Sequence, residues 1–348
     1  MGRHLTMNDI ARIANVSVAT VSRVLANAPN VRAETRDRVL QAVASNHYEP
    51  SHIARSLSTR KTHTLGVVID DMANPFFMEL AKGVESVLRE GGYTMLLTSS
   101  NWDVNEEREL VRTLVRNRVD GVLIAAVDPE SDAVTFLREA GVPFVLVNCC
   151  SESDEISYIA GDSYAGGRLA GECLLRTPVE QCLCLIGVPH QSTEERTQGF
   201  IDAITAHGKA QDLEVYHDVH TFEDGYNIAA RIIALHRVHT VVTGIFASND
   251  FVAMGVVDGL LDHGLRVPQQ VSVIGYDNIE FAKRYRVPLT TINQPKKTMG
   301  ELAAAELIRL VEDREYRGRR LLLSPRLVIR QSCRPATDRQ TGWSPNES

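Results

Sequence analysis

Side chains that could form hydrogen bonds with a nucleic acid are concentrated between residues 17 and 27 of this 348-residue chain. Hydroxyl and amide groups donate to phosphate oxygens, and the planar guanidinium of Arg23 matches the two acceptors on the exposed edge of guanine. Val18 and Ala19, at the start of the segment, offer only methyl contacts, as to the methyl group of thymine. The expected phosphate contacts are Ser17, Thr20, Ser22 and Asn27.

A second set of polar side chains follows apolar, strand-like runs in the remainder of the chain. Carboxylates, amides and an arginine around stacking rings such as Phe76 and Phe77 suit a polyhydroxylated ligand, because each hydroxyl donates and accepts while the ring faces are apolar. A purine would suit nearly as well, and a single Asp after a strand is more often a helix cap. The polar candidates are Asp70, Asn74, Asn148, Asn249, Asp277 and Gln294.

Neither set of side chains matches a known catalytic motif. The sequence has no G-x-S-x-G, H-E-x-x-H, Walker or G-x-G-x-x-G motif. Its six cysteines lack the paired spacings of a zinc site or a disulfide framework, so we expect ordinary reduced thiols. We therefore expect a binding protein and not an enzyme, with no metal and no cofactor.

The charge of the chain is divided unevenly between the two sets. Residues 1–61 contain nine Lys or Arg and four Asp or Glu, a net charge of +5, whereas the remainder contains 28 basic and 40 acidic residues, a net charge of −12. This division predicts a polyanionic partner for the basic segment alone, since the acidic body repels phosphates. The sequence has no run of 18 apolar residues and no apolar stretch before a cleavage site in its first eight residues, so we expect a cytoplasmic protein without a membrane span.

Three short helices must position the first set. Capping residues and apolar spacing predict helices over residues 6–14, 18–25 and about 34–45. Two short helices joined by a tight turn form a helix-turn-helix, whose second helix enters the major groove of DNA. A helical packing domain without nucleic acid is the alternative on charge and geometry alone. The expected core residues are Ile10, Ala11, Ile13, Ala14, Val21, Val24, Leu25, Val39, Leu40 and Val43.

A further short helix is expected over about residues 51–58, where a serine follows Pro50, with a linker after it. Such a helix is marginal in water, because its nucleation costs more than a few hydrogen bonds return. It should therefore form fully only when another element supports it.

The acidic body, which we bound at residues 62–334, positions the second set. Apolar strand-like runs alternate with helical stretches in two series, at residues 65–147 and 182–274. This alternation predicts an α/β fold of two lobes, each a doubly wound parallel sheet, with a ligand cleft at the carboxyl ends of the strands. The last residues, 335–348, are polar and are expected to form a disordered tail.

The basic segment resembles a known family. The ungapped blocks at residues 6–11 and 16–25 are similar to the helix-turn-helix head of the lactose-repressor (LacI/GalR) family of transcription regulators. The resemblance implies a dimer that binds a pseudo-palindromic DNA operator, most often as a repressor, and it places Thr6 among the DNA-binding residues. In the family, the helix that matches residues 51–58 pairs on DNA and inserts a leucine into the minor groove. Leu57 matches that leucine, and Ala54 lies one turn earlier.

The resemblance extends through the body to about Arg330 and also includes periplasmic sugar-binding proteins. It implies a periplasmic-binding-protein-like core in which Arg196 holds ligand oxygens, Asp277 accepts from hydroxyls, and Phe76 and Phe222 enclose the sugar ring. His190 is expected to be a solvated loop residue. The implied ligand contacts are Asn74, Phe76, Phe77, Arg196, Phe222, Asn249, Asp277 and Gln294.

Two departures and two alternatives accompany this resemblance. Asn148 and Cys149 stand where ribose-binding members have Asp and Arg, which argues against simple ribose recognition, and the tail lacks the leucine heptads of a tetramer. The leading hypothesis is a dimeric regulator controlled by a sugar or sugar derivative, which either releases DNA or strengthens its binding. The alternative is a sugar-binding transport protein, which would need an export signal and no DNA-binding head.

Overall fold

The computed structural model describes residues 5–25, 28–46, 48, 61–187, 189–235, 242–313 and 315–333. It divides into two compact units, Met1–His63 and Thr64–Ser348. The expected helix at residues 51–58, with Ala54 and Leu57, lies outside the described residues, as do Asn27 and the expected tail. Within the described residues, no helix is long and apolar enough to cross a membrane.

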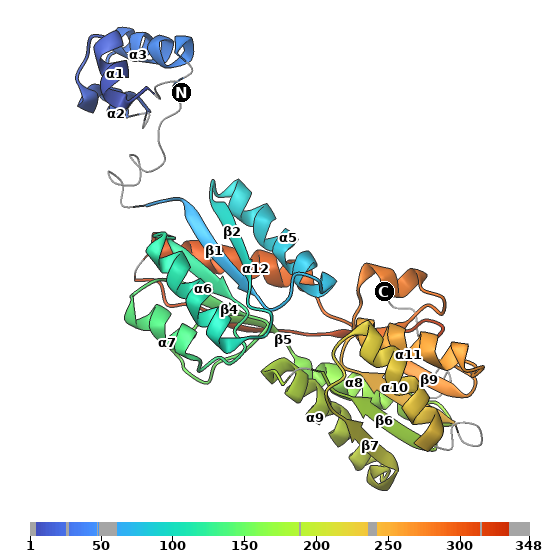
Figure 1. Cartoon of the computed structure of the whole chain (residues 1–348). Helices are drawn as coiled ribbons and strands as arrows, with labels where there is room; N and C mark the ends of the chain where they lie inside the picture. The colour runs from blue at the N-terminus through green and yellow to red at the C-terminus, as the bar shows by residue number, and fades with distance from the viewer. Residues whose placement is uncertain are drawn as a thin grey trace, which may run out of the picture. The chain divides into compact units, whose positions relative to one another are not determined.

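The first unit contains the three expected helices (Figure 1): α1 (Met7–Ile13), α2 (Val18–Leu25) and α3 (Ala33–Ser45). Thr6 caps α1 in a capping box, because the Asp9 amide donates to Thr6 Oγ1 (3.3 Å) and the Thr6 amide donates to Asp9 Oδ2 (2.9 Å). Ser17 caps α2, with its Oγ accepting from the amide of Thr20 at 3.1 Å. Asn15, with a φ of +50°, makes the turn between the two helices.

The core of the first unit is smaller than the sequence predicts. Ile13 and Leu40, expected in it, are 48% and 46% exposed, so the prediction was wrong at these two positions. Each lies at the edge of its helix's apolar arc, and three short helices leave that edge uncovered. Ala42 and Tyr48 are buried there instead. The buried core residues are Ile10, Ala11, Ala14, Val21, Val24, Val39, Ala42 and Tyr48.

The second unit begins with a lobe built around a parallel sheet of order β11-β5-β4-β3-β1-β2. Helices α5 and α12 cover one face of this sheet, and α6 and α7 cover the other (Figure 1). Its elements are β1 (Thr64–Ile69), α5 (Pro75–Glu90), β2 (Thr94–Ser99), α6 (Val104–Arg116), β3 (Gly121–Ile124), α7 (Asp132–Glu139), β4 (Phe144–Val147), β5 (Tyr158–Gly161), α12 (Lys296–Glu312) and β11 (Arg320–Leu323).

The second lobe has a sheet of order β12-β10-β9-β8-β6-β7, parallel except where β12 pairs antiparallel with β10. Helices α10 and α11 cover one face, and α8 and α9 cover the other. Its elements are α8 (Ser163–Leu175), β6 (Gln181–Leu185), α9 (Gln191–Ala206), η1 (Ala210–Asp212), β7 (Leu213–Tyr216), α10 (Phe222–Leu235), β8 (Thr243–Ala247), α11 (Asp250–Asp262), β9 (Val271–Asp277), η2 (Glu280–Arg284), β10 (Thr290–Asn293) and β12 (Arg326–Val328). The predicted α/β fold of two doubly wound lobes is confirmed.

The chain crosses between the lobes after β5, after β10, and between β11 and β12. After the second crossing, α12 returns to the first lobe and packs closely on α5. A Cβ at Gly300 would lie 2.1 Å from the carbonyl oxygen of Leu80, and one at Gly83 would lie 2.1 Å from that of Lys297, so only glycine permits this approach. The packing of α12 therefore fixes the residues just before it, including Gln294, at the junction of the lobes.

Candidate functional sites

The outward face of α2 carries the candidate nucleic-acid contacts. Ser17, Val18, Ala19 and Arg23 are exposed, and Thr20 and Ser22 are half-buried. Residues 18 and 22, like residues 19 and 23, are one helical turn apart and therefore share a side of the helix. The opposite side is fixed by the fully buried Val21 and by Val24.

Thr6 lies exposed at the start of α1, with its side chain in the capping box. The Ser17 and Thr20 hydroxyls are 2.9 Å apart and share a hydrogen bond. The structure thus presents Val18, Ala19 and Arg23 as protruding side chains, flanked by hydroxyl groups that are already oriented by the helix start.

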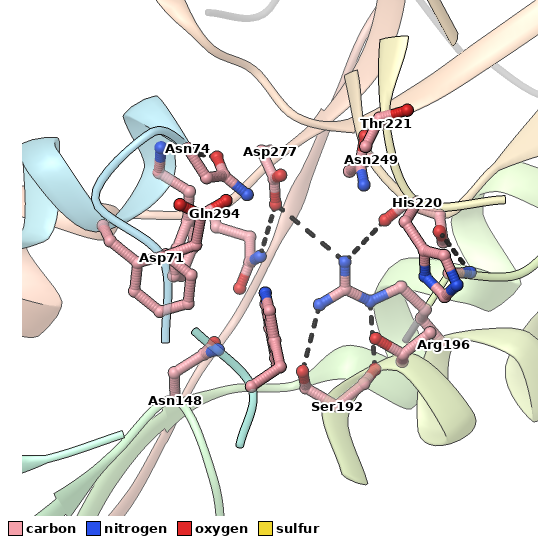
Figure 2. A pocket seen from close by; sticks show the side chains of 16 residues that line it. Asp71, Asn74, Asn148, Ser192, Arg196, His220, Thr221, Asn249, Asp277 and Gln294 are labelled. Carbon is pink, nitrogen blue, oxygen red and sulfur yellow. Dashed lines mark hydrogen bonds and ion pairs between the residues drawn. The ribbon is translucent and has the colours of Figure 1, made fainter. Parts of the chain in front are cut away.

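A cavity of about 340 Å³ lies between the two lobes (Figure 2). Most of its polar lining residues lie at or just beyond the carboxyl end of a strand, as expected for this architecture, whereas Ser192, Thr193 and Arg196 lie in α9. Eight of the ten predicted effector contacts line it: Asn74, Phe76, Phe77, Asn148, Arg196, Asn249, Asp277 and Gln294. The other lining residues are Asp71, Trp102, Gly187, Ser192, Thr193, His220, Thr221 and Ser248.

Arg196 is held rigidly on the second-lobe wall of the cavity. Its Nε donates to the carbonyl oxygen of Ser192 (2.9 Å) and its Nη1 to that of Ser248 (2.7 Å). The guanidinium stacks 3.9 Å above the ring of Tyr276. A Cβ at Gly167 would lie 1.8 Å from the Arg196 carbonyl oxygen, so only a glycine in α8 lets α9 pack this closely against it. The arginine is therefore oriented before any ligand arrives.

Asp277 faces Arg196 and connects it to the first lobe. Its Oδ1 lies 3.9 Å from Arg196 Nη1 and accepts a hydrogen bond from Gln294 Nε2 at 2.9 Å. The buried ammonium of Lys296, in α12, donates to the backbone oxygens of Asp277 (2.5 Å) and Asn278 (3.2 Å). Burial raises the pKa of Asp277, an effect that Arg196 and Lys296 oppose. The result is a fixed acceptor for ligand hydroxyls.

The structure corrects the placement of Asp70, which does not line the cavity. Its side chain is fully buried in the first lobe, and neither carboxyl oxygen has a hydrogen-bond partner within the described ranges. Burial, reinforced by the carboxylates of Glu107 and Asp71, raises the pKa of Asp70 well above its usual range. The next residue, Asp71, reaches the cavity instead.

Phe222 is not among the residues that line the cavity, so the expected enclosure of a ring by Phe76 and Phe222 stays a prediction. Asp224 Oδ2 accepts from the amides of His220 (3.0 Å) and Thr221 (2.9 Å), which starts α10 at Phe222. That helix start packs Phe222 against the core of the second lobe, and the two residues before it line the cavity.

Sequence reasoning missed Trp102, the tryptophan of the cavity wall. It lies just beyond β2 in the left-handed region (φ +63°), and its ring meets Phe77 and His190 edge to face, at centroid distances of 5.9 and 5.5 Å. The signal that identified the other candidates, a position just after a strand, applies to Trp102 as well. The cavity thus has an aromatic cluster on its first-lobe side.

His190 is not the solvated loop residue that the sequence suggested. It is 2% exposed and caps α9, because its Nδ1 accepts from the amide of Ser192 (3.2 Å). Its Nε2 therefore carries the proton and donates to the carbonyl oxygen of Ala126, on the first lobe, at 3.0 Å. Next to it, Gln191 Oε1 accepts from the amide of Cys150 (2.7 Å), so the start of α9 joins the two lobes.

Comparison with known proteins places both parts of the chain in known families of domains. Residues 62–331 match periplasmic binding proteins and the sugar binding domain of the LacI family, and residues 6–51 match bacterial regulatory proteins of the lacI family. Together these regions span most of the chain. The chain belongs to the LacI family, and it is a DNA-binding regulator of transcription.

Individual relatives cover nearly the whole chain. It is 35% identical over 332 residues to the HTH-type transcriptional repressor PurR of Photobacterium profundum, covering 94% of this chain and 98% of that protein. The Lac repressor dimer bound to operator and the anti-inducer ONPF is 26% identical, with a TM-score of 0.84 over 95% of this chain and 99% of that one. The complex of the transcriptional regulator CelR with cellobiose is 28% identical, with a TM-score of 0.69 over 94% and 99% of the two chains.

The buried position of His190 makes stability depend on pH. Burial, together with the charge of Arg196, lowers the pKa of His190 to about 4, against about 6.5 in an unfolded chain. The unfolded state therefore binds the extra proton first, and this group costs about 2 kcal/mol of unfolding free energy as the pH falls from 7 to 5. His190→Asn keeps a capping oxygen and should lose correspondingly less stability over that range, measured by urea unfolding.

Parallel stability curves for wild type and His190→Asn between pH 7 and 5 would show that His190 is solvated in solution.

Proposed function

We propose that this protein is a dimeric, cytoplasmic repressor whose affinity for its operator is set by a sugar or sugar derivative bound between the lobes. The observation that carries the proposal is the juxtaposition of Arg196 and Asp277, 3.9 Å apart in a cavity lined by both lobes. The same chain presents an exposed helix-turn-helix face.

The chemistry of the cavity supports a polyhydroxylated effector. Asp277, Asn148 and Gln294 accept and donate in a confined space, and Arg196 presents a planar set of donors. Phe76 and Trp102 supply apolar faces for the carbon side of a sugar ring. A cavity of about 340 Å³ is within the usual range for small-ligand sites. A structural neighbour, CelR, is itself a cellobiose complex.

The proposed division of labour assigns residues 1–61 to DNA binding, with a hinge helix at about 51–58, residues 62–334 to effector binding and dimerisation, and residues 335–348 to a tail. The basic charge of residues 1–61 supports the first assignment. We propose a pseudo-palindromic operator, because a two-fold dimer presents two such heads. The proposed DNA contacts are Thr6, Ser17, Val18, Ala19, Thr20, Ser22, Arg23, Asn27, Ala54 and Leu57.

Control by the effector follows from the position of the cavity. Its walls come from both lobes, so a ligand that touches both favours one angle between them. A ligand can shift that angle only as far as its affinities for the two states differ, typically by about 1 to 3 kcal/mol. The angle sets the separation of the two segments that lead to the heads, and hence their ability to pair on DNA.

The exposed Arg23 generates a prediction about operator reading. Arg23→Ala should weaken binding to an operator selected from random duplexes by about 1 to 3 kcal/mol if Arg23 reads a guanine, with a smaller effect on random duplex. The measurement is a fluorescence-anisotropy titration of both duplexes. The matched control is Arg12→Ala, because Arg12 is also an exposed arginine and pairs with Asp9 on α1. Equal losses of binding affinity for both duplexes would show that Arg23 contacts only phosphate.

The cleft generates a second prediction. Arg196→Ala should abolish the effector response of operator binding while leaving effector-free operator affinity nearly unchanged, because Arg196 lies in the second lobe and belongs to a unit separate from the head. The measurement is operator titration with and without an effector found by thermal-shift screening of sugars and sugar derivatives. Arg168→Ala, on the exposed side of α8, controls for loss of a surface arginine. A full response with unaltered effector affinity in Arg196→Ala would refute this cleft as the sensor.

A further inference from the structure

We propose that the cleft accepts an uncharged or amino-bearing polyhydroxylated effector and excludes phosphorylated and acidic sugars, with Asp71 as the residue that sets this preference. The inference rests on the proposed function, since it concerns the ligand of the same cavity. It follows from how the charged groups and helix ends around the cavity are already occupied.

Arg196, the cation of the cavity wall, and Lys296, a buried cation outside the lining, both have partners in the protein itself. Arg196 donates to the carbonyl oxygens of Ser192 and Ser248 and lies opposite the carboxylate of Asp277. Lys296 is buried, donates to two backbone oxygens, and lies 3.5 Å from Glu79 Oε2. A phosphate site normally offers cationic groups in excess of the local acids. Here the acids balance the cations before the ligand enters.

Asp71 then adds a negative charge to the wall. Its carboxylate lines the cavity on the first-lobe side, near Asn74 (Figure 2). Its Oδ1 accepts from the amide of Ala73 at 2.7 Å, which fixes the side chain in a local turn. Within the part of the chain that the structure describes, Asp71 forms no ion pair. A carboxylate in this state pairs with an ammonium group or accepts from hydroxyls, and it repels an anion.

The helix ends around the cavity give a second, independent argument. Amides at a helix N-terminus are the common anion-binding device of α/β proteins. Helices α5, α9 and α11 all start at or beside this cavity, and in each a neutral side chain already occupies one of the N-terminal amides. Asn74 accepts from the Phe76 amide (3.0 Å), His190 from the Ser192 amide (3.2 Å), and Asn249 from the Val252 amide (2.8 Å). In α5, Pro75 also removes one amide donor altogether.

A phosphorylated sugar in this cavity would therefore meet the carboxylates of Asp71 and Asp277, while the cation of the wall, Arg196, already faces Asp277. Neutral hydroxyls meet both hydrogen-bond acceptors and hydrogen-bond donors in the cavity. An ammonium group gains an ionic partner in Asp71. The sign of the electrostatic potential at the cavity wall is the property that decides between these ligand classes.

Trp102 makes that potential measurable without knowledge of the effector. The sequence has one other tryptophan, Trp343, so Trp343→Phe gives a protein whose tryptophan fluorescence comes from the cavity wall. Collisional quenching of this protein by iodide, caesium and neutral acrylamide, at constant ionic strength, reports how anions and cations approach Trp102. Asp71→Asn is compared in the same background, because asparagine retains the oxygen that accepts from Ala73.

We expect the ratio of the caesium to the iodide Stern–Volmer constant to fall about twofold in Asp71→Asn, with the acrylamide constant unchanged, because the substitution removes one negative charge from the cavity wall that Trp102 shares. Glu90→Gln makes the same change of charge at the far end of α5, about 20 Å along the helix from the cavity, and should leave the ratio unaltered. An unchanged ratio in Asp71→Asn, or a fall of the same size in Glu90→Gln, would overturn the proposal.

A ligand screen completes the test. Matched sets of a sugar, its phosphate, its uronic acid and its amino derivative are compared by thermal shift with wild type and Asp71→Asn. The proposal predicts stabilisation by neutral or amino members and none by their acidic counterparts, with the discrimination reduced in Asp71→Asn. Preference for a phosphate or uronic acid would overturn it. Failure of every compound would contradict the proposed function instead, and the quenching result would then decide the charge preference by itself.

Discussion

The pairing of a buried guanidinium with a buried carboxylate in the interlobe cavity is the constraint on which the rest of the site depends. Removing Arg196 and Asp277 from water is costly, and the cost is offset only if both groups have close partners. The carbonyl oxygens of Ser192 and Ser248, the ring of Tyr276 and the amide of Gln294 supply those partners. Because these groups come from separate strands and helices, the whole second lobe must fold before the pair can exist.

The junction of the lobes adds a further set of contacts that does not require a ligand. Lys296 joins α12 to the backbone after β9, and the start of α9 reaches the first lobe through His190 and Gln191. These bonds hold the two lobes near one angle. An effector therefore acts by stabilising or destabilising that angle. This suits a switch whose coupling energy is typically about 1 to 3 kcal/mol.

Apolar spacing and capping residues, which can be read from neighbouring positions in the sequence, determine many of the helices and strands, and these parts were predicted well. The limits of α2 follow from apolar spacing and capping, and the rule that ligand groups follow strand ends found Asn74, Asn249 and Asp277. The errors arise where a contact distant in sequence decides. His190 is buried because its partner is Ala126, 64 residues away. Phe222 packs against the core of the second lobe, whose residues come from several separate strands and helices.

The central claim is that one cavity is coupled to DNA binding, and reciprocity tests it most directly. Effector affinity is measured by calorimetry for the free protein and for the protein saturated with operator. The account predicts that operator changes effector affinity by the same factor by which effector changes operator affinity. An effector that occupies the cavity and binds the free and the operator-bound protein equally well would contradict it.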